Sequence, residues 1–161
     1  YPRVKNGDDE ESSVDIGFVG EITRVNAHII TVLESEGFIP VIAGTGVGED
    51  GATYNINADT VAGEVAAALS AAKLILLSDI RGVLRDQDDP SSLISTIRAA
   101  DVPGLREEGV LSGGMIPKIE ACLIALDGGV RKAHIIDGRI SHCLLHEIFT
   151  DDGIGTQLTR S

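Results

Sequence analysis

The segment YNINADT, residues 54–60, places three polar side chains at every second position around the start of a predicted helix: Asn55, Asn57 and Asp59. Backbone N–H groups and the helix dipole favour an anion at such a terminus, so an Asn–Asn–Asp set could bind a carboxylate or orient a cation. The ordinary alternative is that Asn57 is only an N-cap and that Asp59 complements the dipole. Spacing alone leaves both interpretations open.

The segment SGGMIPK, residues 112–118, is the second candidate for chemistry. Gly113 and Gly114 allow close backbone approach, Pro117 suits a first helical turn, and Lys118 projects from that turn. An ammonium group here could stabilise charge on a transferring phosphoryl group. The alternative is a solvated lysine on an amphipathic helix.

Several other site types are absent from the sequence. There is no G-x-x-x-x-G-K-[ST] and no G-x-S-x-G, whereas the glycine-rich GTGVGEDG has the spacing G-x-G-x-x-G at residues 46–51. His142 and His146 are four residues apart but lack the H-E-x-x-H pattern, so we predict no metal site. Cys122 and Cys143 lack a C-x-x-C spacing and are predicted to be reduced thiols.

Composition narrows the class of protein further. The 161 residues suffice for one domain, and the formal net charge of −12 argues against nucleic acid as a partner. No run of about 20 uncharged apolar residues exists, so we expect no membrane span.

Short apolar runs alternate with amphipathic segments, which is typical of α/β proteins. We predict a mostly parallel sheet with helices on both faces. The predicted buried strands are 38–44, 73–77 and 133–137, with an edge strand at 93–97. The predicted helices are 26–36, 58–72, 101–110, 113–129 and 141–149, the fourth with Ile119, Cys122, Leu123 and Leu126 on one face. Residues 1–13 read as a flexible acidic segment, and residues after 149 as an acidic, glycine-containing tail.

Three loops follow the carboxyl ends of the predicted buried strands: 44–57, 78–84 and 137–139. Open α/β sheets bind ligands at that edge. We therefore expect the asparagine-rich segment to lie there.

Seven segments in order carry a resemblance to a known family: GFVGE (17–21), IPVIAG (39–44), YNINAD (54–59), LILLSDIRGVL (74–84), SGGMIPK (112–118), HIIDGR (134–139) and HEIFTDDGIGT (146–156). The chain from Val14 to Thr156 resembles the C-terminal half of N-acetylglutamate kinases, members of the amino acid kinase family. Residues 88–94 are similar to the plant, algal and cyanobacterial forms. The resemblance implies an αβα sandwich truncated to its nucleotide-binding half, with residues 14–161 forming the C-terminal ATP-binding lobe.

The activity implied by the resemblance is phosphoryl transfer from ATP to the side-chain carboxylate of N-acetyl-L-glutamate, in arginine biosynthesis. Asn55 and Asn57 would bind that substrate, Asp59 would orient the catalytic lysines, and Lys118 would neutralise charge at the phosphoryl group. The implied ATP-binding residues are Ser78, Asp79, Ile80, Arg81, Gly82, Val83, Val110, Leu111, Ser112, Gly113 and Met115. Mg²⁺ would accompany ATP with few direct protein ligands.

The resemblance also implies regulation. His134, Glu147 and Gly153 fall at positions similar to those that contact arginine in arginine-inhibited members, with Glu147 meeting the guanidinium group. The alternative is a strand-edge histidine, a surface glutamate and a turn glycine. A PII-type regulator and homo-oligomerisation of the full-length protein are further implied partners, in the cytoplasm or, for a plant or alga, the plastid stroma.

The chain departs from the family pattern at its front, because the K-x-G-G loop, a second glycine pair and a substrate-binding arginine are all missing. Since one of two cations beside the phosphoryl group is absent, we expect little or no turnover from these residues alone. A non-catalytic remnant that binds arginine or a regulator is one alternative. A sibling kinase for aspartate, glutamate or carbamate is another, although YNINAD and SGGMIPK argue against it.

Overall fold

The computed structural model describes residues 18–150 and 153–161, so the predicted flexible segment 1–13 lies outside the described residues. The helices are α1 (Ala27–Ser35), α2 (Ala58–Ala68), α3 (Val102–Glu107), α4 (Met115–Asp127) and α5 (Cys143–Phe149), with 3-10 turns at Pro90–Ser92 and Ala99–Asp101. The strands are β1 (Thr45–Val47), β2 (Thr53–Asn55), β3 (Lys73–Ser78), β4 (Thr96–Arg98), β5 (Lys132–Asp137) and β6 (Thr156–Thr159).

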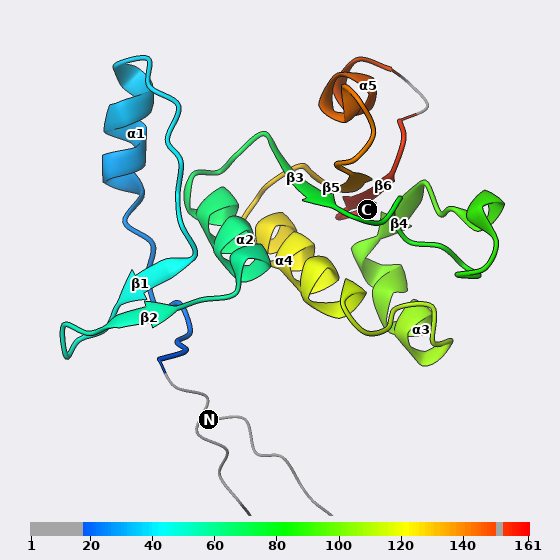
Figure 1. The fold of residues 1–161 in the computed structure, drawn as a ribbon, viewed down its shortest axis with the longest axis horizontal. Coiled ribbons are helices and arrows are strands. Elements are labelled where there is room, and N and C mark those ends of the chain that lie inside the picture. Colours follow the sequence, from blue (N-terminus) through cyan, green and yellow to red (C-terminus); the bar gives the residue numbers. More distant parts are fainter. Residues whose placement is uncertain (1–17, 151–152) are drawn as a thin grey trace, which may run out of the picture.

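The main sheet has the strand order β3-β5-β6-β4. Strands β3 and β5 pair in parallel, as do β4 and β6, whereas β5 and β6 are antiparallel. Helices α2, α3 and α4 lie on one side of this sheet and α5 lies on the other (Figure 1). The predicted α/β class, with a mostly parallel sheet covered on both faces, is confirmed.

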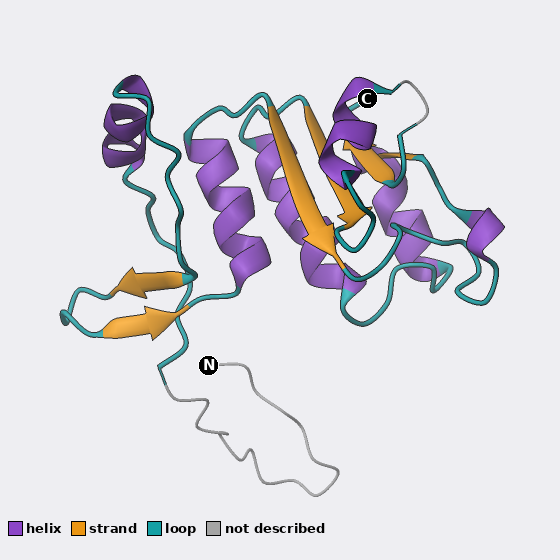
Figure 2. Cartoon of the chain, turned by 45° about the horizontal axis from the view of Figure 1, so that its top comes forward, coloured by secondary structure: helices purple, strands orange, loops and turns teal. Residues whose placement is uncertain are grey.

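Helices α2 and α4 pack side by side beneath the sheet (Figures 1 and 2). Small residues permit the close approach, because a Cβ added at Gly63 would lie 2.6 Å from the carbonyl oxygen of Ala121. The predicted apolar face of α4 is confirmed for Ile119, Cys122 and Leu126, which are almost fully buried. The core is therefore formed between the α2/α4 layer and the sheet.

The predicted ends of α1 are also present. The side chain of Asn26 accepts a hydrogen bond from the backbone N–H of His28 at 3.2 Å, and so caps the helix. Gly37 follows the helix with φ of 81°, a left-handed conformation that glycine adopts without steric strain.

Residues 38–44 are not a buried strand, so that prediction is wrong. They form no described helix or strand, and the side chains of Ile39 and Val41 are 91% and 95% exposed. Their apolar sequence suits a strand, but within this stretch the carbonyl oxygen of Gly44 accepts from the backbone N–H of Ile56, and the backbone of residues 39–42 pairs with no described segment.

The predicted glycine-rich loop 44–57 is also partly wrong, because it contains the antiparallel hairpin β1/β2. Gly51, with φ of 77°, lies in the turn of this hairpin. Strand β6, within the stretch predicted as a tail, is the other difference. Its Leu158 is fully buried between β5 and β4, which is a long-range pairing that no local pattern indicates.

Within the described residues, no helix is long and apolar enough to cross a membrane.

Two glycine-to-alanine replacements test the helix packing. Alanine favours a helix by about 1 kcal/mol over glycine. At Gly63 the new methyl group meets Ala121 backbone, so we expect Gly63→Ala to lower the free energy of unfolding by about 1–3 kcal/mol. Gly104 in α3 has no atom within 4 Å of an added Cβ, so Gly104→Ala should be neutral or stabilising. Urea unfolding of both variants measures the difference, and equal stabilities would contradict this account of the packing.

Candidate active site

An ion pair joins the N-terminal turns of α2 and α4. The Nζ atom of Lys118 lies 3.0 Å from Oδ2 and 3.3 Å from Oδ1 of Asp59. The two side chains are 20% and 22% exposed, so the pair is shielded from bulk water and still reachable by a ligand. The two candidate motifs, 59 residues apart in sequence, therefore form one site.

The two helices run in the same direction, since Asp59 faces Lys118 and Gly63, one turn on, faces Ala121. Both N-termini consequently lie at the same end of the layer, and their dipoles add to the charge of Lys118. In α4 the backbone amides of Met115 and Ile116 already donate to the carbonyl oxygens of Ser112 and Gly113. The attraction for an anion thus comes from the dipoles and the ammonium group.

Asn57 is the N-cap of α2, as the ordinary interpretation held. Its Oδ1 atom accepts hydrogen bonds from the backbone N–H groups of Asp59 at 2.9 Å and Thr60 at 3.2 Å. Asn55 ends β2, where its backbone pairs with Phe18 and Gly20 and its side chain is exposed. Asn57 therefore fixes the helix end that presents Asp59, and Asn55 lies at the neighbouring surface.

A cavity of about 360 Å³ lies against Lys118. Its lining is Ser78, Asp79, Ile80, Gly82, Val83, Leu84, Gln87, Val110, Ser112, Gly114, Met115 and Lys118. Eight of the eleven residues predicted for ATP are in this lining, whereas Arg81 and Gly113 are outside it and Leu111 is buried in the core. The two loops that the sequence grouped together thus both line one cavity.

Gln87 is a lining residue that sequence reasoning missed. Its Nε2 atom lies 3.4 Å from the hydroxyl oxygen of Ser112, so it joins the loop after β3 to the loop before α4. No motif indicates this role, because Gln87 lies in an acidic loop that reads as surface.

Thr156 of β6 anchors the loop that follows β3. Its hydroxyl oxygen accepts from the backbone N–H of Val83 at 2.8 Å and donates to the carbonyl oxygen of Ile94 at 2.7 Å. Gly82, with φ of 146°, packs so tightly here that an added Cβ would lie 2.6 Å from that same hydroxyl. The cavity wall is therefore held by a residue from the strand that the sequence analysis did not predict.

The sequence profile of the amino acid kinase family matches residues 4–137. The chain belongs to the amino acid kinase family. Its Asp59–Lys118 pair and the cavity beside it lie within the matched range.

Curated relatives in the family are acetylglutamate kinases. The chain is 56% identical over 160 residues to that of Pelotomaculum thermopropionicum, covering 99% of this chain and 54% of the relative. It is 55% identical over 158 residues to that of Geobacter sulfurreducens, covering 98% of this chain and 53% of the relative. The chain thus spans about half the length of the curated relatives it matches.

Solved structures share the fold of this chain. N-acetylglutamate synthase from Neisseria gonorrhoeae, complexed with coenzyme A and L-arginine, is 28% identical with a TM-score of 0.82, covering 92% of this chain and 34% of that one. Carbamate kinase from Giardia lamblia bound to AMP-PNP is 19% identical with a TM-score of 0.61, covering 84% and 44%. The second likeness concerns the fold alone.

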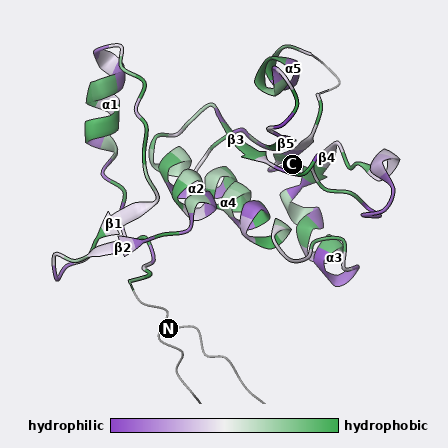
Figure 3. Ribbon diagram, viewed as in Figure 1, coloured by the Kyte–Doolittle hydropathy of each residue, from purple (hydrophilic) through white to green (hydrophobic). Residues whose placement is uncertain are grey.

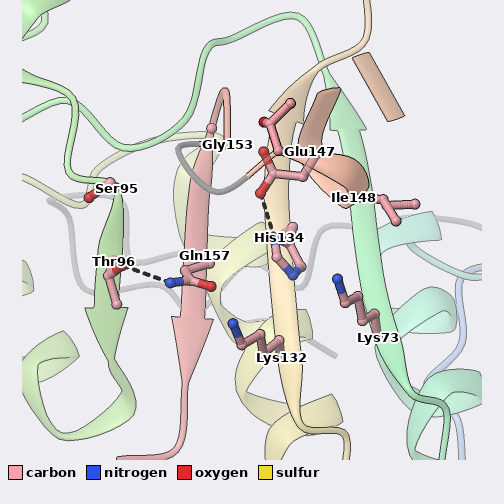
Figure 4. Close-up of a pocket in the computed structure, with 11 residues that line it drawn as sticks. Lys73, Ser95, Thr96, Lys132, His134, Glu147, Ile148, Gly153 and Gln157 are labelled. Atoms are coloured by element: carbon pink, nitrogen blue, oxygen red, sulfur yellow. Dashed lines mark hydrogen bonds and ion pairs between the residues drawn. The ribbon is translucent and has the colours of Figure 1, made fainter. Parts of the chain in front are cut away.

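A second cavity in this amino acid kinase chain, of about 290 Å³, brings together His134, Glu147 and Gly153 (Figure 4). His134 Nδ1 lies 2.6 Å from Glu147 Oε1, and both side chains are 5% exposed. The backbone N–H of Ile154 donates to the other oxygen of Glu147 at 2.8 Å. The three residues predicted for an effector therefore line one cavity.

Charge in this second cavity is divided between its ends. Burial raises the pKa of Glu147, but hydrogen bonds from the Ile154 amide and His134 outweigh it and leave that pKa below its usual range. Lys73 and Lys132, adjacent in the β3/β5 register, line the far side of His134 from Glu147 (Figure 4). Among the described residues, His134 Nε2 is a buried side-chain atom with no hydrogen-bond partner.

The two cysteines, which the sequence predicted to be reduced thiols, are inert or structural. Cys122 and Cys143 are free and buried, and burial, with a further contribution from the charge of Asp59, raises the pKa of the Cys122 thiol to about 12. No cluster of three or more His, Cys, Asp or Glu side chains that could hold a metal ion occurs among the described residues.

Asp137 and Arg139 form a clamp at the carboxyl end of β5. Arg139 donates to Asp137 from Nε and Nη2, each at 2.9 Å, and from its backbone N–H at 3.0 Å. These bonds lower the pKa of Asp137 to about 2. Gly138, between them, donates to the carbonyl oxygen of Ser78 at 2.8 Å, so the clamp adjoins the start of the cavity wall.

This clamp predicts a specific acid dependence. Since the pKa of Asp137 is lowered from 3.8 to about 2, its stabilisation is present above pH 4 and is lost as the pH falls toward 2. Asp137→Asn should lower the free energy of unfolding at neutral pH. It should also remove the part of the decrease in that free energy that Asp137 causes between pH 4 and pH 2. Arg139→Ala should reproduce most of the effect, because its side-chain bonds are the largest cause. Urea unfolding at stepped pH measures both, and an unchanged acid limb in both variants would refute the assignment.

Proposed function

We propose that this chain is the C-terminal, ATP-binding lobe of an acetylglutamate kinase, which transfers the γ-phosphoryl group of ATP to the side-chain carboxylate of N-acetyl-L-glutamate. Supporting this proposal are the relatives of that name at 55–57% identity across nearly the whole chain. The observation that carries it is the position of Lys118, held by Asp59 in the lining of a cavity to which two loops contribute.

Lys118 supplies positive charge where the transition state is most anionic. Phosphoryl transfer proceeds through a loose transition state with charge on the equatorial oxygens, and catalysis is mostly positioning and electrostatics. Asp59 keeps the ammonium group from swinging into solvent, and the two helix dipoles add to its field. No covalent nucleophile is needed, in keeping with the buried, inert Cys122.

The cavity beside Lys118 takes the nucleotide in this proposal. Apolar walls from Ile80, Val83 and Met115 suit an adenine ring, and Ser78 and Ser112 offer hydroxyl groups. Mg²⁺ neutralises phosphate charge when bound with ATP. Asp79 is the carboxylate in the cavity lining that could approach it, while Asp59 is engaged by Lys118, so we propose that few protein ligands hold the ion.

Asn55 and Asn57 have different roles in this proposal. Asn57 uses its side-chain oxygen as the cap of α2, which makes it a positioning residue for Asp59. Asn55, exposed two residues earlier, is the one we assign to N-acetyl-L-glutamate. Because the chain spans about half the length of its relatives, we propose that it binds ATP but turns over weakly without the remaining length. A cytoplasmic location is proposed from the bacterial relatives.

The second cavity favours a second role, the binding of arginine as an effector. A buried carboxylate at Glu147 complements a guanidinium group, and Lys73 with Lys132 complements an α-carboxylate at the other end. The arginine complex of the similar synthase supports this choice of ligand. A chain that keeps this role without catalysis is the alternative function.

Lys118→Ala tests the catalytic assignment. In the chain assembled with the remaining length of the Pelotomaculum relative, we expect kcat for acetylglutamate phosphorylation to fall about 10²–10³-fold, with a smaller change in ATP affinity. Arg106→Ala, which removes the cation of the exposed Arg106–Glu120 pair, is the control and should keep wild-type rates. Normal turnover in Lys118→Ala would remove the assigned role.

Glu147→Gln tests the effector site by stability. Arginine at about 100 times its Kd should stabilise the wild-type chain by about 2.7 kcal/mol. The variant should lose this stabilisation, because a neutral amide cannot pair with the guanidinium group. Glu120→Gln, an exposed glutamate on α4, is the matched control and should respond as wild type. Thermal unfolding with and without arginine is the measurement, and no shift in the wild type discards the effector role while leaving the kinase proposal intact.

A further inference from the structure

Gln87 lines the cavity beside Lys118 although no motif includes it. It stands in the lining together with Val83 and Leu84. Among the described residues its side-chain amide makes one hydrogen bond, from Nε2 to the hydroxyl oxygen of Ser112 at 3.4 Å. A side-chain amide has two N–H donors and a carbonyl oxygen that accepts. One N–H and the carbonyl oxygen of Gln87 are therefore available to a ligand in the cavity.

The loop that carries Gln87 is held in shape by its own polar side chains. The hydroxyl oxygen of Ser92 accepts from the backbone N–H of Asp86 at 3.0 Å and donates to the carbonyl oxygen of the same residue at 2.8 Å. Oδ1 of Asp89 accepts from the backbone N–H of Ser91 at 2.8 Å and from its hydroxyl group at 2.7 Å. Since these bonds order the loop before any ligand binds, a contact made by Gln87 costs little conformational entropy.

Charge indicates which part of a nucleotide lies against Gln87. Lys118 supplies the positive charge that phosphate groups need. Gln87 is neutral, and its sequence neighbours Asp86 and Asp88 are exposed carboxylates that would repel phosphates. Figure 3 shows hydrophilic residues at the outer end of this loop, between β3 and β4. The uncharged base is therefore the part of the nucleotide that suits the Gln87 end of the cavity.

Adenine and guanine differ in the order of the hydrogen-bonding groups that an amide would meet. Adenine has its N6 donor beside a ring-nitrogen acceptor, so a glutamine amide can pair with both atoms. Guanine has the O6 acceptor in the place of N6. An amide held in one orientation therefore makes two hydrogen bonds to adenine, whereas its carbonyl oxygen would face the O6 acceptor of guanine.

We propose that Gln87 recognises the base of the bound nucleotide and, held in one orientation by Ser112, selects adenine over guanine. This inference rests on the proposed nucleotide-binding function and names the residue that sets the base specificity of that cavity. The carbonyl oxygen of Gln87 accepts from N6 of adenine, and one N–H donates to the neighbouring ring nitrogen. The other N–H stays on the Ser112 hydroxyl.

Calorimetric binding of ATP and of GTP, each with Mg²⁺, to this chain tests the inference. The wild type should bind ATP more tightly than GTP. In Gln87→Ala we expect the Kd for ATP to rise about 10-fold and the Kd for GTP to change little, so the preference for ATP narrows by the same factor. A residue that only tied two loops together would change both affinities alike.

Asp88→Ala is the matched control, because Asp88 neighbours Gln87 but lies outside the cavity lining. It should keep the wild-type preference for ATP. If Gln87→Ala binds ATP and GTP with the wild-type preference, the inference is overturned while the nucleotide site of the kinase proposal stands. If the wild-type chain binds neither nucleotide, both the nucleotide site and the inference are overturned.

Ser112→Ala separates the orientation of the amide from its contact with the base. Without the hydroxyl group the Gln87 amide can turn over and present an N–H to O6 of guanine. We therefore expect GTP to bind about 3–10-fold more tightly than to the wild type, and adding Gln87→Ala should remove that gain. Both residues are exposed, so the fold, checked by circular dichroism, should be unchanged. An unchanged or weaker affinity for GTP in Ser112→Ala would contradict the orienting contact.

Discussion

The close parallel packing of α2 against α4 is the constraint on which the site depends. Gly63 against Ala121 brings the helices near enough for Asp59 to hold Lys118. Because the helices run in the same direction, both dipoles point their positive ends at the same place. A larger residue at the crossing would separate the charges, and the site would lose both the ion pair and the focused field.

Two long-range anchors then shape the cavity beside that pair. Thr156 fixes the loop after β3 through the Val83 amide, and the Asp137–Arg139 clamp with Gly138 fixes its start at Ser78. The first anchor comes from β6, which pairs with β5 and β4, and the second comes from the end of β5, which pairs with β3. The loop is thus a rigid wall, which suits a site that works by positioning charge rather than by bond formation with the protein.

The same sheet that places the first cavity at the carboxyl end of β3 places the second along β5. His134 lies within β5 and Asp137 ends it, so one strand contributes to the second cavity and to the wall of the first.

The sequence by itself determined the local elements and the identity of the chemical groups. Asn26 and Asn57 as caps, the buried face of α4 and strands β3 and β5 follow from patterns within ten or so residues. The family resemblance implied that Asp59 orients Lys118, and the tertiary structure places the two in contact. Only the tertiary structure decided that Gln87 and Thr156 support the cavity and that Phe38, Ile39, Val41 and Ile42 are exposed. Apolar patterning indicates which side chains tend to be buried. Whether a distant segment packs against those side chains is decided by the tertiary structure.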